Sequence, residues 1–258
     1  VGQYFFDQLT ANAMRRTQEV EHQGTRLRFS TTNTLTKYRA DTFSSKEPET
    51  LDWIDRIPTG STIWDVGANI GLYTCYAVKA RQCRVFAFEP SVFNLELLAR
   101  NIFYNDITND VTIIPLPLSQ KLACSKLSMT STDWGGALST FGQSHGHDGD
   151  IIKKVFEFPT LGLSAVDALN LLKIPVPDFI KIDVDGIEHL ILEGAESLLP
   201  QVKGVLIEIN DNFDEQSSKS SQYLKKAGFE LTEKKHADFY DEEETAAKYT
   251  FNQIWINR

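Results

Sequence analysis

The sequence predicts an α/β protein with a mostly parallel sheet covered by helices on both faces. From residue 61 onward, strand-like and helix-like segments alternate, which is typical of βαβ units. The strand-like segments, such as "STIWDV" and "GVLIEI", are nearly continuous apolar runs, as burial on both faces requires. Ligands of such sheets bind beyond the carboxyl ends of the strands. We therefore expect functional residues directly after the strands.

The segments ahead of this pattern form a separate prediction. The expected elements are an amphipathic helix over 3–19, short strands over 25–30 and 34–43, and a helix over 47–57 that starts at Pro48. We take 1–45 as an N-terminal extension and 46–258 as the main domain. The extension could cover the active site or mediate a homo-oligomer, and the sequence leaves both open.

The main domain is long enough for a substantial core, since the chain has 258 residues and 41% apolar content. The predicted strands are 61–66, 83–90, 111–119, 178–184, 204–209 and 249–258. The predicted helices are 71–80, 92–103, 163–172 and 187–200, and 220–231 reads as a helix running into a strand.

Composition excludes several classes of partner. The net charge is -9, from 26 basic and 35 acidic residues. This argues against broad binding to nucleic acid or to an anionic membrane, because both favour basic surfaces. Three widely spaced cysteines predict buried, reduced thiols and no disulfide framework. Without a signal-peptide pattern or an apolar run of roughly 18 residues, we expect a cytoplasmic protein.

The stretch "IWDVGANIGL", residues 63–72, is the first candidate ligand site. Asp65 closes a strand, and Gly67 and Gly71 bracket the turn into a helix, where glycine permits close approach of a ligand. The spacing differs from the dinucleotide fingerprint because Asn69 stands where its second glycine would be. An acid beside a helix N-terminus suits a ligand with an ammonium and a carboxylate, such as S-adenosylmethionine. Alternatively, the glycines only serve a tight turn.

The second candidate is Glu89, which closes the next strand 18 residues after Gly71. An acid at this place can accept hydrogen bonds from both ribose hydroxyls of an adenosine. This predicts an adenosine ligand without distinguishing NAD from S-adenosylmethionine. Pro90 ends the strand and Ser91 can cap the next helix. The alternative is an exposed acid favoured by the helix dipole.

Three segments together, "DVGANIG" from Asp65, "FAFEP" around Glu89 and "FIKIDVDGIEHLILEGA" over 179–195, resemble the FkbM family of S-adenosylmethionine-dependent methyltransferases. The resemblance covers roughly 46–210 and includes "EPET" and "VLIEI". It implies a class I methyltransferase (Rossmann-like) fold, a three-layer sandwich whose seven-stranded sheet has an antiparallel last strand. It also implies S-adenosylmethionine as cofactor and transfer of a methyl group to a hydroxyl of a sugar or natural product.

The resemblance implies cofactor contacts at Asp65, Gly67, Asn69, Gly71 and Glu89. Ala68, Pro90, Ser119 and Asp183 complete the predicted cofactor-binding set. Many family members carry Glu where this chain has Asp185, which weakens any role assigned to that residue. The stretch 134–150, "WGGALSTFGQSHGHDGD", matches no family segment, and the choice of acceptor could lie there.

Methyl transfer to a hydroxyl needs alignment and a proton acceptor. Asp183, at the end of the central strand, is the first choice for this base. Glu208 at the end of "VLIE" is the second, and His189 is a third candidate that could equally lie on a helix surface. Asp185 and Glu188 read more simply as a D-x-x-E helix cap.

No metal site is predicted. His145 and His147 form an HxH pair without a third ligand, which favours a loose polar loop. Asp183 and Glu208 could together hold Mg²⁺, but a third oxygen ligand is again missing, so a metal-free route is preferred.

The leading hypothesis is an O-methyltransferase acting on a small-molecule or saccharide acceptor. An NAD-dependent oxidoreductase is the alternative enzyme, and the absent glycines count against it. A catalytically inactive cofactor-binding subunit is the non-enzyme alternative. The chain lacks the Asn/Asp-Pro-Pro-Tyr/Phe motif, which argues against methylation of nucleic-acid amino groups.

Overall fold

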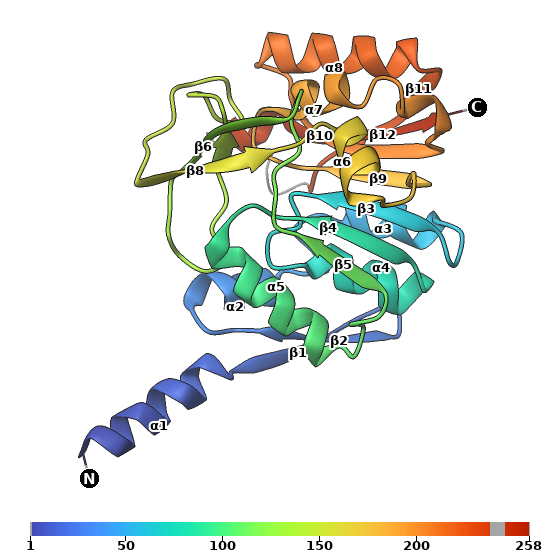
Figure 1. The fold of residues 1–258 in the computed structure, drawn as a ribbon. Coiled ribbons are helices and arrows are strands. Elements are labelled where there is room, and N and C mark those ends of the chain that lie inside the picture. Colours follow the sequence, from blue (N-terminus) through green and yellow to red (C-terminus); the bar gives the residue numbers. More distant parts are fainter. Residues whose placement is uncertain (1, 238–245, 258) are drawn as a thin grey trace.

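A computed structural model describes residues 2–237 and 246–257 and has a seven-stranded central sheet (Figure 1). The strand order is β11-β12-β10-β9-β3-β4-β5. β12 runs antiparallel to both of its neighbours, whereas the pairs from β10 to β5 are parallel. The predicted α/β fold with a mostly parallel sheet and an antiparallel last strand is confirmed.

The strands of this sheet are β3 (Thr62–Val66), β4 (Arg84–Phe88), β5 (Val111–Ile114), β9 (Phe179–Ile182), β10 (Gly204–Asn210), β11 (Phe229–Lys235) and β12 (Thr250–Asn257). β5 is shorter than predicted because Pro115 follows it, and proline has no N–H for the ladder. Arg258, the last residue of the predicted closing strand, lies outside the described residues.

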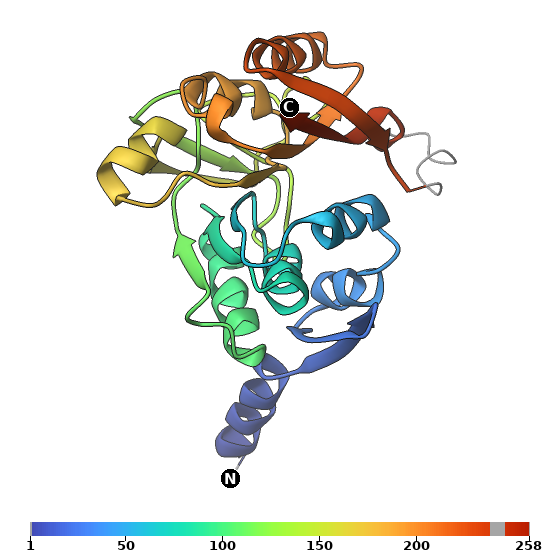
Figure 2. The ribbon, with the colours of Figure 1, turned by 90° about the vertical axis from the view of Figure 1, so that its right-hand side faces the viewer.

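Helices cover both faces of the sheet (Figures 1 and 2). They are α3 (Pro48–Arg56), α4 (Leu72–Arg81), α5 (Val92–Tyr104), α6 (Ala165–Leu172), α7 (Glu188–Gly194) and α8 (Asp214–Lys226), with 3-10 turns η1 (Leu199–Gln201) and η3 (Ala246–Tyr249). Buried side chains of α3, α4 and α5 form one core cluster, and those of α6, α7 and α8 form another. The two clusters lie on opposite faces of the sheet and make the outer layers of a three-layer sandwich.

Two N-terminal predictions are wrong. Residues 34–43, predicted as a strand, begin with the helix α2 (Thr34–Asp41), because Asn33 and Thr36 form a reciprocal capping box. The predicted helix 3–19 ends earlier, as α1 (Gly2–Met14), and is followed by β1 (Thr17–His22). β1 pairs with β2 (Thr25–Ser30) through Gln23 and Gly24, whose positive φ angles of 47° and 80° suit a tight hairpin.

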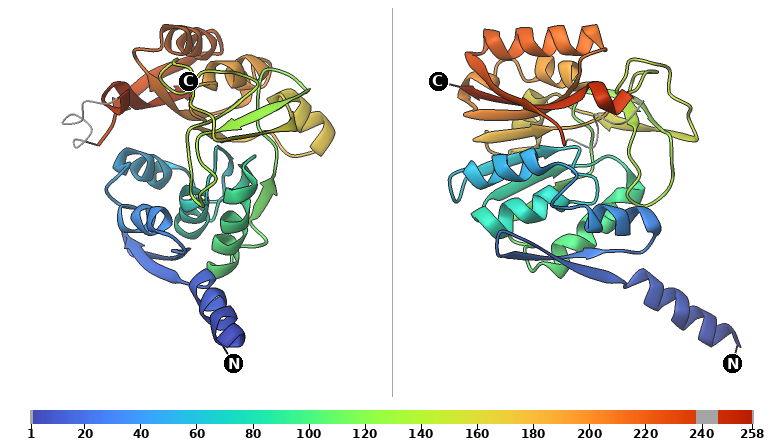
Figure 3. Two further views of the ribbon diagram at one scale, coloured as in Figure 1. Left: turned by 90° about the vertical axis from the view of Figure 1, so that its left-hand side faces the viewer. Right: turned by 180° about the vertical axis from the view of Figure 1, so that it is seen from behind.

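The N-terminal segment divides into two parts. None of the residues of α1 is buried, and this helix projects away from the body (Figure 3). In contrast, Leu27, Phe29 and Phe43 belong to the same core cluster as Tyr76 and Leu98. Residues from β2 onward therefore pack continuously with the main body.

A small antiparallel sheet was not predicted. It consists of β6 (Ala123–Met129), β7 (Ser139–Phe141) and β8 (Phe156–Gly162), in the order β7-β6-β8. β7 lies within the stretch 134–150, and an isolated bridge joins His145 to Ile151. The loop predicted around His145 and His147 follows β7 and consists of turns and bends with this one bridge.

The cysteines and the lengths of the helices bear on two further predictions from the sequence. Cys75 and Cys83 are buried free thiols as predicted, but Cys124 is exposed on β6. No helix within 2–237 or 246–257 is long and apolar enough to cross a membrane.

Candidate active site

The strand ends form one row of residues across the sheet. Val66 pairs with both Phe88 and Ile182, so β3, β4 and β9 end at the same level. Ile207 of β10 also pairs with Ile182. The next positions, read from β4 to β12, are Glu89, Gly67, Asp183, Glu208 and Asn252, the last of which pairs with Glu208. The fold therefore brings together three acids that are far apart in the chain.

Two cavities meet at this row. The main cavity has a volume of about 240 Å³ and contains Glu208 and Asn252 in its wall. The side cavity has a volume of about 50 Å³ and contains Glu89 and Pro90 in its wall. The residues that line both are Gly67, Asn69, Ala137, Asp183 and Asp185. Asp183 thus lies at the junction between the two cavities.

The turn after β3 is shaped by packing as well as by its access to the cavities. Gly67 has a φ of 87°, and a Cβ at this position would clash with the backbone carbonyl of Asp183. Gly71 (φ 82°) precedes the first turn of α4, and a Cβ there would strike Leu98. Gly71 lines neither cavity, whereas Gly67, Ala68 and Asn69 line the main one. The tight-turn interpretation therefore accounts for both glycines, and the turn itself faces the cavity.

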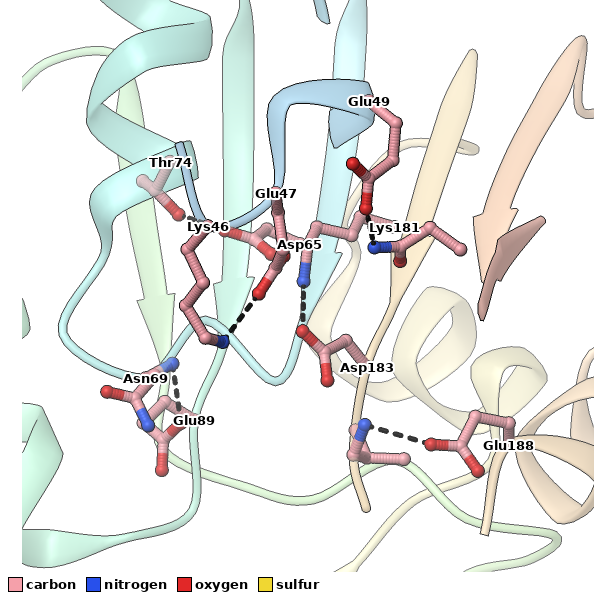
Figure 4. Close-up of polar contacts among 12 residues, drawn as sticks. Lys46, Glu47, Glu49, Asp65, Asn69, Thr74, Glu89, Lys181, Asp183 and Glu188 are labelled. Atoms are coloured by element: carbon pink, nitrogen blue, oxygen red, sulfur yellow. Dashed lines mark hydrogen bonds and ion pairs between the residues drawn. The ribbon is translucent and has the colours of Figure 1, made fainter. Parts of the chain in front are cut away.

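Asp65 lies one layer below the row. It pairs with Lys181 across the β3–β9 ladder, accepts a hydrogen bond from the Thr74 hydroxyl, and lines neither cavity (Figure 4). Burial raises the pKa of its carboxyl, and the nearby Lys181 ammonium opposes that rise. The structure places this acid behind the turn, where it faces Lys181.

Glu89 lies in the side cavity and is 5% exposed. Its Oε2 accepts from the amide of Asn69 and its Oε1 from the amide of Ser91, both at 2.8 Å. Burial raises the pKa of this carboxyl to about 7. Each oxygen keeps a further lone pair for a ligand. Ser119 lines neither cavity, and its amide donates to the Leu163 carbonyl at 2.7 Å.

Asp183 is held by a buried lysine that the sequence analysis missed. The Lys181 ammonium is 2.8 Å from Oδ2 of Asp183, and the lysine is 2% exposed. Burial alone lowers a lysine pKa, but the carboxylates of Asp183, Asp65 and Glu47 raise that of Lys181 above its usual value. The signal in the sequence was a single lysine inside the apolar strand "FIKI".

Glu208 is a second carboxyl in the main cavity. Burial, followed by the charges of Asp183 and Glu47, raises its pKa well above the ordinary value. Asp183 and Glu208 thus form a carboxyl pair in which one member is paired with a lysine and the other favours the protonated form.

The predicted D-x-x-E cap is wrong. Ile187 is the N-cap of α7, and Asp185, with a φ of 63°, accepts hydrogen bonds from the amides of Leu138 and Ser139. Glu188 accepts from the amides of Val184 and Gly186. Both acids organise loops around the strand end, and neither accepts from the amides of the first turn of α7.

His189 lies away from both cavities. It is 2% exposed, and its ring packs edge-on against Phe213 with centroids 5.9 Å apart. Burial lowers its pKa. This histidine is neither on the helix surface nor in contact with the cavities.

Further charged residues of the main cavity come from the first turn of α3 and the two residues before it. Lys46 Nζ is 2.8 Å from Glu47 Oε1, and Glu49 Oε1 accepts from Asn252 Nδ2 at 2.7 Å (Figure 4). Burial opposes ionisation of Glu47, but the Lys46 and Lys181 ammonium groups lower its pKa to about 2. In the sequence these residues appear only as a charged stretch, "KEPE", at a helix start.

The segment 134–139 forms a roof over the junction, and polar side chains hold it in place. Asn94 accepts from the amide of Gly135 and donates to the carbonyl of Gly136, each at 3.0 Å, and Asn69 donates to the same carbonyl at 2.8 Å. Arg39 of α2 donates to the Gly135 carbonyl at 2.8 Å. The roof covers the side cavity, whose volume of about 50 Å³ is smaller than that of the main cavity.

Histidines and acids do not assemble into a metal site in the described part of the chain. No group of three His, Cys, Asp or Glu residues there is placed to hold an ion. His147 lines the main cavity, and His145 instead packs on Phe213 with ring centroids 5.1 Å apart.

Comparison with known proteins agrees with this geometry. The model of the methyltransferase FkbM domain matches residues 65–231. The hexuronic acid methyltransferase AglP of Haloferax volcanii is 25% identical over 209 residues, 80% of each chain. The methyltransferase sdnD of Sordaria araneosa is 37% identical over 67 residues, 26% of each chain. A crystal structure of methyltransferase FkbM from Methylobacillus flagellatus superposes with a TM-score of 0.54 at 14% identity, covering 88% of this chain and 54% of that one.

This family and fold imply S-adenosylmethionine as the methyl donor, and the chemistry of the cavities fits it. Glu89 has acceptor capacity for ribose hydroxyls, and Pro90, Leu118 and Phe141 supply apolar surface for a purine. From the matched domain, the sheet and this row of strand-end residues, the chain belongs to the FkbM family of methyltransferases.

Proposed function

We propose that this protein transfers a methyl group from S-adenosylmethionine to a hydroxyl of a carbohydrate. The observation that carries the proposal is the position of Asp183 at the junction of the two cavities. Glu89 and the Gly67–Asn69 turn would hold the adenosine part on one side, and the main cavity would hold the acceptor on the other. When bound, S-adenosylmethionine supplies a methyl group already activated on a sulfonium.

The residues of the chain then have to align the acceptor hydroxyl and accept its proton. The Lys181 ammonium donates to one oxygen of Asp183, which orients the carboxylate at the junction. We assign Asp183 as the general base, a role worth roughly 10² to 10⁴ in rate. Glu208, whose pKa is raised by burial, is suited to donate a hydrogen bond to the acceptor as a neutral carboxyl.

The main cavity supports a carbohydrate as acceptor. Acids, an amide and two lysines line it, and a sugar presents many hydroxyls that can donate to and accept from such groups. The relative in Haloferax volcanii bears the name hexuronic acid methyltransferase, which supports the same acceptor class.

The first experiment is calorimetric titration of S-adenosylhomocysteine and, in parallel, NADH into the wild type and Glu89→Ala. We expect binding of the homocysteine compound alone and its loss in Glu89→Ala. Glu96→Ala serves as the matched control, since Glu96 lies on the outer surface of α5 and pairs with Arg100. Binding of NADH without binding of S-adenosylhomocysteine would overturn the proposal.

The second experiment identifies the acceptor group. The enzyme is incubated with radiolabelled S-adenosylmethionine and a panel of neutral sugars and hexuronic acids, and the products are treated with alkali. A methyl ether on a hydroxyl survives alkali, whereas a methyl ester on a carboxylate is hydrolysed. Alkali-labile product would show that the carboxyl, and not a hydroxyl, receives the methyl group.

A further inference from the structure

Two adjacent residues of opposite charge, Lys46 and Glu47, face the turn after β3 across the main cavity. Their charged atoms are 2.8 Å apart, and both residues line the cavity together with Gly67, Ala68 and Asn69. Glu47 is 6% exposed, whereas the Lys46 side chain is 30% exposed. The pair thus presents a negative and a positive group side by side in the cavity wall.

Glu47 has a buried oxygen that no hydrogen-bond donor satisfies. Its Oε1 accepts from Lys46, but Oε2 is buried without a partner of hydrogen-bond geometry, although the nearby Tyr73 hydroxyl helps to lower the pKa of the carboxyl. A buried, ionised oxygen left without a donor is unfavourable. This atom therefore indicates that a donor from outside the chain completes the site.

Several other charged groups in or near the main cavity have partners within the chain. Lys181 pairs with Asp183, and Glu49 accepts from Asn252. Asp65, expected from the sequence to meet an ammonium, faces Lys181 and the Thr74 hydroxyl behind the turn. Among these carboxylates, Glu47 combines a place in the cavity wall with an unsatisfied oxygen.

The position of the pair matches one end of the cofactor. If Glu89 holds the ribose in the side cavity, the rest of the molecule must pass over Gly67 and Asn69, which line both cavities, and enter the main cavity. There it meets Lys46 and Glu47. The amino-acid end of S-adenosylmethionine is a zwitterion, with an ammonium that donates and a carboxylate that accepts.

We propose that Lys46 and Glu47 form the subsite for this amino-acid end, in which Glu47 accepts from the ammonium and Lys46 donates to the carboxylate. The assignment rests on the proposed methyltransferase function. It places the methionine contact before α3, in a segment outside the matched domain residues 65–231.

The test compares two nucleosides that differ in this end alone. S-adenosylhomocysteine carries the amino-acid group, and 5′-methylthioadenosine lacks it. We expect Glu47→Gln to weaken the binding of S-adenosylhomocysteine roughly 10- to 100-fold, because a hydrogen bond between two charged groups is lost. Lys46→Met should weaken this binding roughly 3- to 10-fold, because the Lys46 side chain is more exposed. Neither change should alter the affinity for 5′-methylthioadenosine, measured by calorimetry.

Asp52→Asn provides the matched control, because it removes one negative charge from an exposed position of α3. Equal weakening of both nucleosides in Glu47→Gln would mean that this residue shapes the whole cavity, and the subsite would be wrong. Unchanged S-adenosylhomocysteine affinity in Glu47→Gln would also overturn it. If the wild type binds neither nucleoside, the proposed function itself fails, which is a distinguishable outcome.

Discussion

The two cavities at the strand ends are built in different ways. In the side cavity, Glu89 is held by the amides of Asn69 and Ser91, both at most 20 residues away in the chain. In the main cavity, the polar groups come from α3 and the residues before it and from β9, β10 and β12, and Glu49 accepts from Asn252 across the fold. A ligand site assembled from neighbouring turns has a local signature in sequence, whereas one assembled by long-range pairing has none until the fold exists.

The largest expected effect of a single change is on the junction between the cavities. Asp183→Asn should lower turnover about 10³-fold, since it removes the proposed proton acceptor, and should leave S-adenosylhomocysteine affinity within about threefold of the wild type. Methyl transfer at saturating cofactor and calorimetric titration measure the two quantities. This separation would show that Asp183 serves the reaction rather than the binding of the cofactor.

The control for this change lies at the other end of the same strand. Asp178 pairs with Lys203 and accepts from the amide of Thr62 at 2.8 Å, and Asp178→Asn should leave turnover within about threefold. Full activity of Asp183→Asn together with an inactive Glu208→Gln would indicate that Glu208, and not Asp183, is the general base.

A smaller effect is expected from the ionisation of Glu89. Burial raises the pKa of this carboxyl to about 7, and only the carboxylate can accept from both ribose hydroxyls. The affinity for S-adenosylhomocysteine should therefore rise roughly tenfold between pH 6 and pH 8, as the carboxyl loses its proton, and then level off. Glu89→Gln should bind more weakly and without this rise. A flat wild-type profile would contradict the assignment of Glu89.

The smallest effect concerns the roof between the cavities. Asn94→Ala removes two hydrogen bonds to Gly135 and Gly136, each worth about 1 kcal/mol, so the 134–139 segment should open more readily. Both association and dissociation of S-adenosylhomocysteine should accelerate by roughly five- to tenfold in stopped-flow measurements, with a smaller change in Kd. Asn109→Ala, at an exposed turn, is the control, and unchanged rates in Asn94→Ala would show that the roof does not limit access.

Much of the central sheet was predictable because the apolar strands and the residues at their ends are local signals. Glu89 and Asp183 each follow directly after an apolar run, and the structure places both in cavity walls. Asp65 has a similar appearance in sequence, but it belongs to β3 itself, where ladder pairing sets it opposite Lys181. A difference of two positions relative to the strand end thus separates an acid in the cavity wall from one beneath it.

The unpredicted parts depend on tertiary contacts or on weak local patterns. β6, β7 and β8 were missed because they mix polar with apolar residues and leave many side chains exposed, so they lack the continuous apolar runs of the central strands. The helix α2 was misread because its short alternating pattern hid the capping box at Asn33. Lys46 and Glu47 precede a helix and carry no sign of the cavity that they face.

The bond between Asn252 and Glu49 joins residues that are 203 positions apart in the chain. In a polypeptide emerging from the ribosome, the main cavity therefore cannot be complete until β12 has been synthesised and has paired with β10. Contacts of such long sequence separation form slowly, because chain closure must precede them. The affinity of this cavity for a ligand would thus report that β12 has paired with β10.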